Sequence, residues 1–276
     1  MSFSVITPSF RHSGWLKLCI ASVADQGMKV EHIVHDAGSD DGTLDWLLKD
    51  ARVQAFVERD AGMYDAINRG LRRAQGDLLA YLNCDEQYLP GALREVESFF
   101  AAHPHVDVLF ADTVVVDAAG EYRFHRKVQK PLRWHTRVWP LATLTCATFF
   151  RRRVLTGPEA YFDTRYKAIG DGVWVHGLLE RGVPMAALGR FTSAFTHTGG
   201  NLGHSDPAKA EFAAWAATAP AWLRATRLLW LLHHRLRRLA GGMYSQRPFD
   251  YALYTPQSPG NRVSRHVAAP DFRWRQ

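Results

Sequence analysis

Residues 77–90 read DLLAYLNCDEQYLP, in which an apolar run at residues 78–82 stops at a polar turn that holds Asp85 and Glu86. A buried strand that stops at acidic residues delivers them to the C-terminal edge of a sheet, where ligands of open α/β folds bind. Carboxylate oxygens suit hard divalent cations, and Mg²⁺ is typically held by one or two of them together with phosphate. The stretch therefore predicts a metal site that faces a diphosphate, although an acidic turn after a strand is more often a solvated loop.

Two earlier segments repeat this pattern of a short strand that ends in polar residues. FSVITPSFR at residues 3–11 is β-branched up to Thr7, after which a proline stops the strand. EHIVHDAGSDDGT at residues 31–43 predicts a second strand that ends at Asp36, followed by turn residues. With helical segments between them, the three strands form a βαβαβ unit, which means a parallel sheet with right-handed crossovers. We therefore expect an α/β fold with Thr7, Asp36 and Asp85 at one edge of the sheet.

Five segments together are more specific than any one of them. In chain order they are VITPSF (5–10), HDAGSDDGT (35–43), ERDAGMYDAINRG (58–70), AYLNCDE (80–86) and CATFFRR (146–152). Their order and spacing resemble those of family 2 glycosyltransferases with the GT-A fold. The resemblance implies a Rossmann-like, mostly parallel sheet flanked by helices. It also implies a nucleotide-sugar donor, a divalent metal (Mn²⁺ or Mg²⁺) and inversion at the anomeric carbon.

The resemblance assigns roles to individual positions. The expected nucleotide-sugar ligands are Thr7, Pro8, Ser9, Asp36, Asp60, Gly62, Asp65, Asn83 and Cys84, and the expected metal ligands are Asp85, Glu86 and His197. The chain departs from the family where the usual Asp-x-Asp reads Asn83-Cys84-Asp85, which leaves Asp85 as the principal ligand. Asp60 and Asp65 are also ordinary first-turn acids that a helix dipole favours. A lone histidine at a strand end, such as His197, is more often structural.

The catalytic base needs a separate argument. Inverting transfer requires a carboxylate that takes the proton of the acceptor hydroxyl, across the sugar from the leaving diphosphate. AIGDGVWVHGLL at residues 168–179 predicts an apolar helix with Asp171 at its start, which resembles the family's base-bearing position. An aspartate there is also a common helix cap, but the family context favours Asp171 as the base. Asp163 matches a more structural motif. Residues 106–111 predict a further strand that ends at Asp112.

The composition fits a soluble enzyme with one main domain. The chain has 276 residues, of which 47% are hydrophobic and 22% charged, so it can bury a substantial core. The cysteines Cys19, Cys84 and Cys146 are scattered and odd in number, which is typical of a reducing compartment rather than of a disulfide framework or a zinc site. With no secretory signal pattern and no long apolar run, we expect a cytoplasmic protein without a spanning helix.

Positive charge is concentrated near the C-terminus, and we expect a catalytic domain at residues 1–218 and a basic extension at residues 219–276. The extension carries ten arginines and two acidic residues, and the net charge of the whole chain is +7. Residues 221–239 predict one amphipathic helix. One face holds Trp222, Leu229, Leu232, Leu236 and Leu239, and Arg224, Arg227, Arg235 and Arg238 flank the other.

Two interpretations of this helix stay open. It suits an anionic membrane surface, with tryptophan at the interface and arginine toward the headgroups, which would place the protein peripherally on the inner face of the membrane. Alternatively, it packs on the catalytic domain with its arginine face in water. Nucleic acid is not an expected partner, because no recognition motif accompanies the arginines.

The expected function is metal-dependent, inverting, hexosyltransferase-type transfer from a nucleotide-diphosphate-sugar to a hydroxyl of a glycan or lipid-linked glycan. One alternative is a catalytically inactive domain of the same fold that binds glycans or membranes; Asp85 and Asp171 argue against it. Another is a nucleotidyltransferase, which also uses acidic strand ends and Mg²⁺. That class leads us to expect a glycine-rich basic loop after the first strand, whereas residues 7–14 contain a single glycine.

Overall fold

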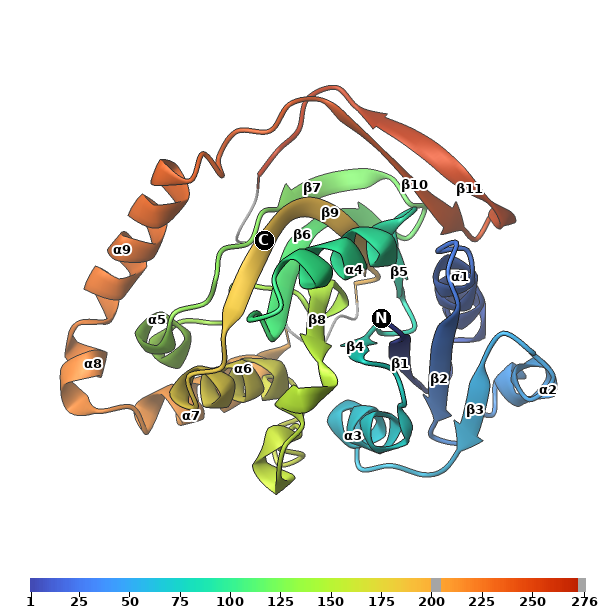
Figure 1. The fold of residues 1–276 in the computed structure, drawn as a ribbon, viewed down its shortest axis with the longest axis horizontal. Helices are drawn as coiled ribbons and strands as arrows, with labels where there is room; N and C mark the ends of the chain where they lie inside the picture. The colour runs from blue at the N-terminus through green and yellow to red at the C-terminus, as the bar shows by residue number, and fades with distance from the viewer. Residues whose placement is uncertain (200–204, 273–276) are drawn as a thin grey trace.

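The structure is a computed structural model and describes residues 1–199 and 205–272. The strands in chain order are β1 (Phe3–Ser9), β2 (Val30–Asp36), β3 (Gln54–Val57), β4 (Leu78–Tyr81), β5 (Glu86–Tyr88), β6 (Val108–Asp117), β7 (Tyr122–Arg126), β8 (Thr148–Arg151), β9 (Met185–His197), β10 (Phe249–Thr255) and β11 (Ser258–Val267). Within the described residues, the main sheet has the order β3-β2-β1-β4-β8-β6-β9-β5, and β7 pairs with β6 outside this path (Figure 1). β10 and β11 form a separate hairpin.

Helices lie between most of these strands. They are α1 (Ser13–Ala24), α2 (Thr43–Leu47), α3 (Met63–Arg73), α4 (Ala92–Ala102), α5 (Arg133–Val138), α6 (Gly170–Glu180), α7 (Asp206–Ala217), α8 (Ala221–Ala225) and α9 (Arg227–Ala240), with short 3₁₀ helices η1 (Thr145–Ala147), η2 (Arg152–Val154) and η3 (Pro158–Ala160). Among the residues that the structure describes, no helix is long and apolar enough to cross a bilayer.

β1 is the centre of the parallel half of the sheet. All its residues are buried, as expected of a parallel strand that helices cover on both faces. β2 pairs with it in parallel, so Ser9 lies opposite Asp36 where the two strands end. β4 pairs in parallel on the other side and leads into the turn that carries Asp85. The predicted βαβαβ unit is therefore confirmed, and its polar strand ends share one edge.

The other half of the sheet is mixed. β8 runs antiparallel between β4 and β6, whereas β9 runs parallel to β6. The prediction that a strand ends at Asp112 is wrong, because β6 continues to Asp117. Register shifts at Asp112 interrupt the pairing with β9, and its carboxylate accepts a hydrogen bond from the backbone N–H of Val128 at 2.8 Å. This contact holds the segment after β7 against the sheet.

Two apolar clusters cover the two faces of the sheet. α1 and α4 pack on one face, where Cys19 and Phe100 are buried, and α3 and α6 pack on the other, where Ile67 and Trp174 are buried. α3 lies so close to β1 that a Cβ at Gly70 would come within 2.4 Å of the side chain of Ile6. A larger residue there would force Ile6 or the helix to shift, so Gly70 sets how closely α3 packs on β1.

The C-terminal residues differ from the single helix expected at residues 221–239. The segment is split, because α8 ends at Ala225 and α9 begins at Arg227. α9 lies at the outer edge of the molecule with α5 as its inner neighbour (Figure 1). Its leucines are exposed while Arg238 is only 3% exposed. Burial of Arg238 therefore contradicts both interpretations at that position, whereas Arg224, Arg227 and Arg235 are exposed as expected.

The β10–β11 hairpin is bonded to the N-terminal part of the chain. The Tyr254 hydroxyl donates to Asp25, the residue that follows α1, at 2.8 Å, and Arg262 forms an ion pair with the same carboxylate. The side-chain amide of Gln87 on β5 and the backbone of Tyr254 exchange two hydrogen bonds at 2.9 Å. The domain boundary at residue 218 stays a prediction, while these contacts join the extension to the main sheet.

Candidate functional site

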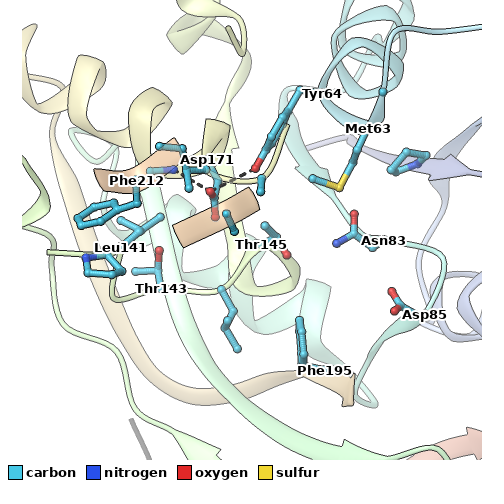
Figure 2. Close-up of a pocket in the computed structure, with 18 of the residues that line it drawn as sticks. Met63, Tyr64, Asn83, Asp85, Leu141, Thr143, Thr145, Asp171, Phe195 and Phe212 are labelled. Carbon is cyan, nitrogen blue, oxygen red and sulfur yellow. Dashed lines mark hydrogen bonds between the residues drawn. The ribbon is translucent and has the colours of Figure 1, made fainter. Parts of the chain in front are cut away.

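A cleft of about 2100 Å³ opens where β1, β2 and β4 end, and α5, α6, α7 and α9 contribute its other walls. Figure 2 shows part of it, with residues of α3 and of the turn after β4 on one side and residues of α6 and α7 on the other. The predicted site residues that line it are Pro8, Ser9, Asp60, Gly62, Asn83, Cys84, Asp85 and Asp171. The other predicted residues lie outside this lining; they are Thr7, Asp36, Asp65, Glu86 and His197.

Asp85 is a half-buried carboxylate in the turn between β4 and β5, and it lies beside Asn83 in Figure 2. Burial raises the pKa of Asp85, and its own backbone N–H and the nearby His12 oppose this effect. Removing a carboxylate from water destabilises its charged form. A cation in the cleft would therefore interact favourably with Asp85.

Glu86 is fully buried, and its carboxylate holds the turn through hydrogen bonds. One carboxylate oxygen accepts from the backbone N–H of Asn83 at 2.8 Å, and the other accepts from the hydroxyl of Thr145 at 3.0 Å. Burial, and then the neighbouring charge of Asp85, raise the pKa of Glu86 to about 8. The geometry gives Glu86 a positioning role for the turn, and its assignment as a metal ligand stays a prediction.

His197 ends β9 on the strand that borders this turn. The antiparallel register pairs Glu86 with Phe195, so the chain runs from Phe195 toward the Asp85 turn as it reaches His197. Residues 200–204, which follow this segment, lie outside the described residues. Within the described part of the chain, no group of three or more His, Cys, Asp or Glu side chains is arranged to hold a metal. His197 therefore stays a predicted ligand.

The two predicted strand-end residues that do not line the cleft are both engaged within the protein. Thr7 is buried, and its hydroxyl lies 2.9 Å from Nε2 of His32. Asp36 is also buried; one of its oxygens accepts from the N–H groups of Gly38 and Ser39, and the other accepts from the Ser39 hydroxyl. Asp36 thus shapes the loop that brings Gly38 into the cleft lining.

The loop before α3 presents Asp60 and Gly62 to the cleft. The Asp60 carboxylate accepts from the Gly62 N–H at 2.8 Å and lies 3.7 Å from Nε2 of buried His35. Gly62 has a φ of +119°, a conformation that a glycine adopts without strain. Asp65 lies in the first turn of α3, where it accepts from the Ala61 N–H at 3.0 Å and forms an ion pair with Arg69. Asp65 therefore holds the loop in place rather than lining the cleft.

Asp171 lines the cleft from the first turn of α6. Its carboxylate accepts from the Gly172 N–H at 2.8 Å and from the hydroxyl of Tyr64 at 3.3 Å, as the dashed lines in Figure 2 show. The capping residue of α6 is Ile169, which makes no side-chain cap bond. Burial raises the pKa of Asp171, and its hydrogen bonds with Gly172 and Tyr64 counteract part of that rise. A raised pKa suits a carboxylate that accepts a proton.

The sequence analysis missed several residues that line this cleft. Tyr64 lies inside the motif at residues 58–70, but only its acids and glycine were selected. His135 on α5 and His234 on α9 stack at 4.0 Å between ring centroids, and their positions carry no recognisable motif. Arg126 on β7 and Arg238 on α9 also line the cleft, and no sequence motif marks either of them.

Comparison with known proteins gives a consistent result. The family model described as glycosyl transferase family 2 matches residues 4–157. The chain is 28% identical over 180 residues to the PGL/p-HBAD biosynthesis glycosyltransferase of Mycobacterium bovis (strain BCG / Pasteur 1173P2), which covers 61% of this chain and 66% of the relative. The match thus spans slightly less than two thirds of that relative's length.

Two solved structures share the fold. TarS 1-349 from S. aureus, in complex with UDP-GlcNAc, has a TM-score of 0.59 at 18% identity, covering 87% of this chain and 75% of that chain. The mannosyltransferase PcManGT from Pyrobaculum calidifontis, in complex with GDP-Man and Mn²⁺, has a TM-score of 0.54 at 16% identity, covering 87% of this chain and 79% of that chain. At these identities the likeness establishes the fold, an α/β sheet similar to that of GT-A glycosyltransferases.

Proposed function

We propose a specific activity for this chain, which belongs to glycosyl transferase family 2. It moves a hexose from a nucleoside-diphosphate-sugar donor to a hydroxyl of a glycan or lipid-linked glycan, with inversion. The observation that carries the proposal is that Asp85 and Asp171 line the same cleft as Ser9, Asp60 and Gly62. One substrate in this cleft thus has access both to a carboxylate suited to a metal and to one suited to a proton. TarS and PcManGT, which share the fold, were solved with nucleotide sugars.

The residues of the cleft fit a divalent metal, Mn²⁺ or Mg²⁺, at Asp85. The desolvated carboxylate of Asp85 is the acidic group of the β4–β5 turn that lines the cleft. A single protein carboxylate suffices where phosphate oxygens complete the coordination. Such a metal supplies charge neutralisation for a departing diphosphate. Glu86 would hold the turn beneath it, and His197 is the proposed additional ligand.

Other residues of the chain would bind the donor, shape the loops and accept the acceptor's proton. Ser9, Asp60, Gly62 and the segment Asn83–Cys84 would contact the nucleotide sugar, because they line the cleft between the strand ends and α3. Thr7, Asp36 and Asp65 would act indirectly by shaping the loops. Asp171 would accept the proton of the acceptor hydroxyl, with Tyr64 orienting its carboxylate through a hydrogen bond.

Replacing the proposed base tests the function. Asp171→Asn is expected to lower turnover by about 10²–10⁴, the usual effect of losing a general base, while donor affinity stays unchanged. Suitable measurements are transfer and hydrolysis of UDP- and GDP-sugars with Mn²⁺ or Mg²⁺, after a thermal-shift screen for the donor. Asp163→Asn is the control, because Asp163 pairs with Arg165 and lies outside the cleft lining. Near-normal turnover in Asp171→Asn would exclude Asp171 as the base.

The proposed location is cytoplasmic, on the inner face of an anionic membrane, with α9 as the contact. Five leucines of α9 are 54–66% exposed; they are Leu228, Leu229, Leu232, Leu236 and Leu239. Arginines accompany them, and residues 219–249 contain no acidic residue. Exposed leucines beside arginines suit an interfacial helix, since the leucines enter the bilayer surface and the arginines reach the headgroups.

A further inference from the structure

Three side-chain oxygens in the cleft are buried without a hydrogen-bond partner. Among the described residues that line the cleft, they are Ser9 Oγ, Asn83 Oδ1 and Thr143 Oγ1. A buried polar atom without a partner is unfavourable, and in a native structure it calls for an explanation such as a ligand or a catalytic role. Ser9 and Asn83 already have proposed roles as contacts of the nucleotide sugar, whereas Thr143 has none.

Thr143 belongs to the segment that links α5 to η1 along the wall of the cleft. It is 4% exposed and lines the cleft. Two residues further on, the hydroxyl of Thr145 donates to Glu86 at 3.0 Å, which joins the segment to the turn that carries Asp85. Within the described part of the chain, the Thr143 hydroxyl makes no bond of this kind. It is therefore available to a molecule in the cleft.

The other end of this segment lies beside the proposed base. A Cβ added at Gly172, the residue after Asp171, would lie 3.7 Å from the Cβ of Leu141, which precedes Thr143 by two residues. Since two residues of chain span at most about 7 Å, the Cα atom of Thr143 lies within that distance of the Cα atoms of both anchoring residues. In Figure 2, Leu141 and Thr143 lie on the opposite side of Asp171 from Asp85. Thr143 is therefore near the proposed reacting groups, on the side where the proposed function places the acceptor.

The surroundings of Thr143 on this side of the cleft are apolar. Leu141 and Phe212 line the same part of the cleft, as Figure 2 shows. α7, which carries Phe212, is held against the start of α6, because Glu211 accepts from the backbone N–H groups of residues 167–169 at 2.7–3.3 Å. Apolar side chains with a few polar groups are typical of a small-molecule site, and the polar groups determine orientation and specificity. A sugar ring fits this site, since its C–H face packs on apolar side chains while its hydroxyls reach a polar atom.

We propose that the Thr143 hydroxyl binds a ring hydroxyl of a sugar substrate beside Asp171 and thereby selects for sugars that carry it. The proposal rests on the proposed function, which brings a donor sugar and an acceptor glycan together in this cleft. A threonine hydroxyl both donates and accepts, so it pairs with a sugar hydroxyl in either direction. A site that hydrogen-bonds a substrate hydroxyl rejects an analogue that lacks it, because the protein group is then left unpaired.

The sugar hydroxyl has two sources that share this chemistry. One is the acceptor glycan, which is favoured because Thr143 lies on the side of Asp171 away from Asp85. The other is the hexose of the donor. Methyl glucoside, methyl galactoside and methyl mannoside represent the first source. UDP-GlcNAc and GDP-Man, the ligands of TarS and PcManGT, represent the second, with UDP and GDP as their references without a sugar.

The melting temperature of the full chain without substrate tests whether the hydroxyl is unpaired. Thr143→Val replaces the hydroxyl by a methyl group of similar size, so it should leave the melting temperature unchanged or raise it. The matched control is Thr148→Val. Thr148 is 3% exposed, lies outside the cleft lining and donates its hydroxyl to the carbonyl of Leu144 at 2.9 Å, so its replacement should lower the melting temperature. An equal drop in Thr143→Val would overturn the inference, because it would show that this hydroxyl is engaged within the protein.

Substrate binding then identifies the source of the sugar hydroxyl. Calorimetric titration with Mn²⁺ compares each nucleotide sugar with its nucleotide, and transfer assays give the KM of the methyl hexosides. Thr143→Val should weaken the interaction with one of the two sugars about three- to tenfold, the loss expected for one neutral hydrogen bond. UDP and GDP should bind Thr143→Val, Thr148→Val and the parent equally. A raised KM for a methyl hexoside with unchanged donor affinity identifies the acceptor, and weaker binding of the nucleotide sugar identifies the donor hexose.

The outcomes separate this inference from the proposed function. If neither the affinity for a nucleotide sugar nor the KM of a methyl hexoside changes in Thr143→Val, the inference is overturned, even where the parent transfers sugar. An equal loss of sugar binding in Thr148→Val would also overturn it, because the effect would then not depend on the cleft. Failure of the proposed function gives a different result, in which the parent binds neither UDP nor GDP with Mn²⁺ and transfers no sugar. The inference then falls with the function on which it rests.

Discussion

Asp85 and Glu86 are adjacent carboxylates in very different environments. Asp85 lines the cleft, whereas Glu86 is fully buried with both oxygens hydrogen-bonded. A carboxylate already engaged by a backbone N–H and a hydroxyl has little capacity left for a cation. The contrast favours Asp85 over Glu86 as the proposed metal ligand, and it gives Glu86 a role in supporting the turn.

Asp85→Asn should weaken binding of a nucleoside diphosphate in the presence of Mn²⁺ by at least about tenfold, the size of effect that ligand-shell changes produce. Binding without metal should not change, because the amide keeps the size and polarity of the side chain. Calorimetry with and without Mn²⁺ measures both values, with Asp163→Asn as the control. Equal metal-dependent affinity in parent and variant would remove Asp85 from this role.

Tyr64 tunes the proposed base. Its hydroxyl donates to Asp171, which stabilises the ionised carboxylate and lowers its pKa. Without this bond, as in Tyr64→Phe, the pKa of Asp171 should rise further, by up to about one unit. Because the base works only when ionised, the acid limb of the turnover profile should move to higher pH. A pH profile of kcat checks this, with Tyr161→Phe as the control; an unmoved limb would contradict the assignment.

At the level of helices and strands, one glycine sets how closely α3 approaches β1. A Cβ at Gly70 would lie 2.4 Å from Ile6, whereas a Cβ at Gly177 in α6 meets nothing within 4 Å. Gly70→Ala should therefore lower the free energy of unfolding by about 1–3 kcal/mol through overpacking. Gly177→Ala should be neutral or stabilise by up to about 1 kcal/mol. Urea unfolding measures both, and equal stabilities would show that α3 shifts without cost.

The sequence predicts best the strands that follow a simple local pattern, in which an apolar run ends at polar residues. The apolar runs that end at Thr7, Asp36 and near Asp85 became adjacent parallel strands, because strand ends in a βαβαβ unit meet at one edge. The same pattern does not say which polar end faces the cleft. The Asp36 carboxylate is bonded within its own loop, and the Thr7 hydroxyl is bonded in the core. The direction of each side chain depends on residues that pack against it from other parts of the chain.

For α9, the sequence pattern fails to predict which face of the helix is buried. Amphipathic periodicity predicts two faces but assumes that the apolar one is buried. In this molecule α5 presents His135 to α9, so His234 and Arg238 face inward and the leucines face outward. The part of the cleft lining that Arg235 and Arg238 form was therefore not predictable from the spacing of residues 221–239.

For the molecule as a whole, the outward leucines predict membrane association. Replacing Leu229, Leu232 and Leu236 by Ser should abolish sedimentation with anionic vesicles, because it removes the apolar area that enters the interface. Leu48→Ser is the control, since Leu48 is 62% exposed but lies after α2. Added salt should weaken binding of the parent by screening its arginines. If the parent chain does not sediment with anionic vesicles at low salt, α9 has another role.

The bonds between Asp25, at the C-terminal end of α1, and the β10–β11 hairpin join positions 229 and 237 residues apart in sequence. Such long-range contacts form late in folding, because the intervening chain must first be brought together. During synthesis on a ribosome, α1 emerges early, but its partner Arg262 emerges only after nearly all the sheet. The C-terminal half of α1 therefore lacks this partner for most of the time that translation takes. Nascent chains that stall before the hairpin should for that reason be preferred targets of chaperones and proteases.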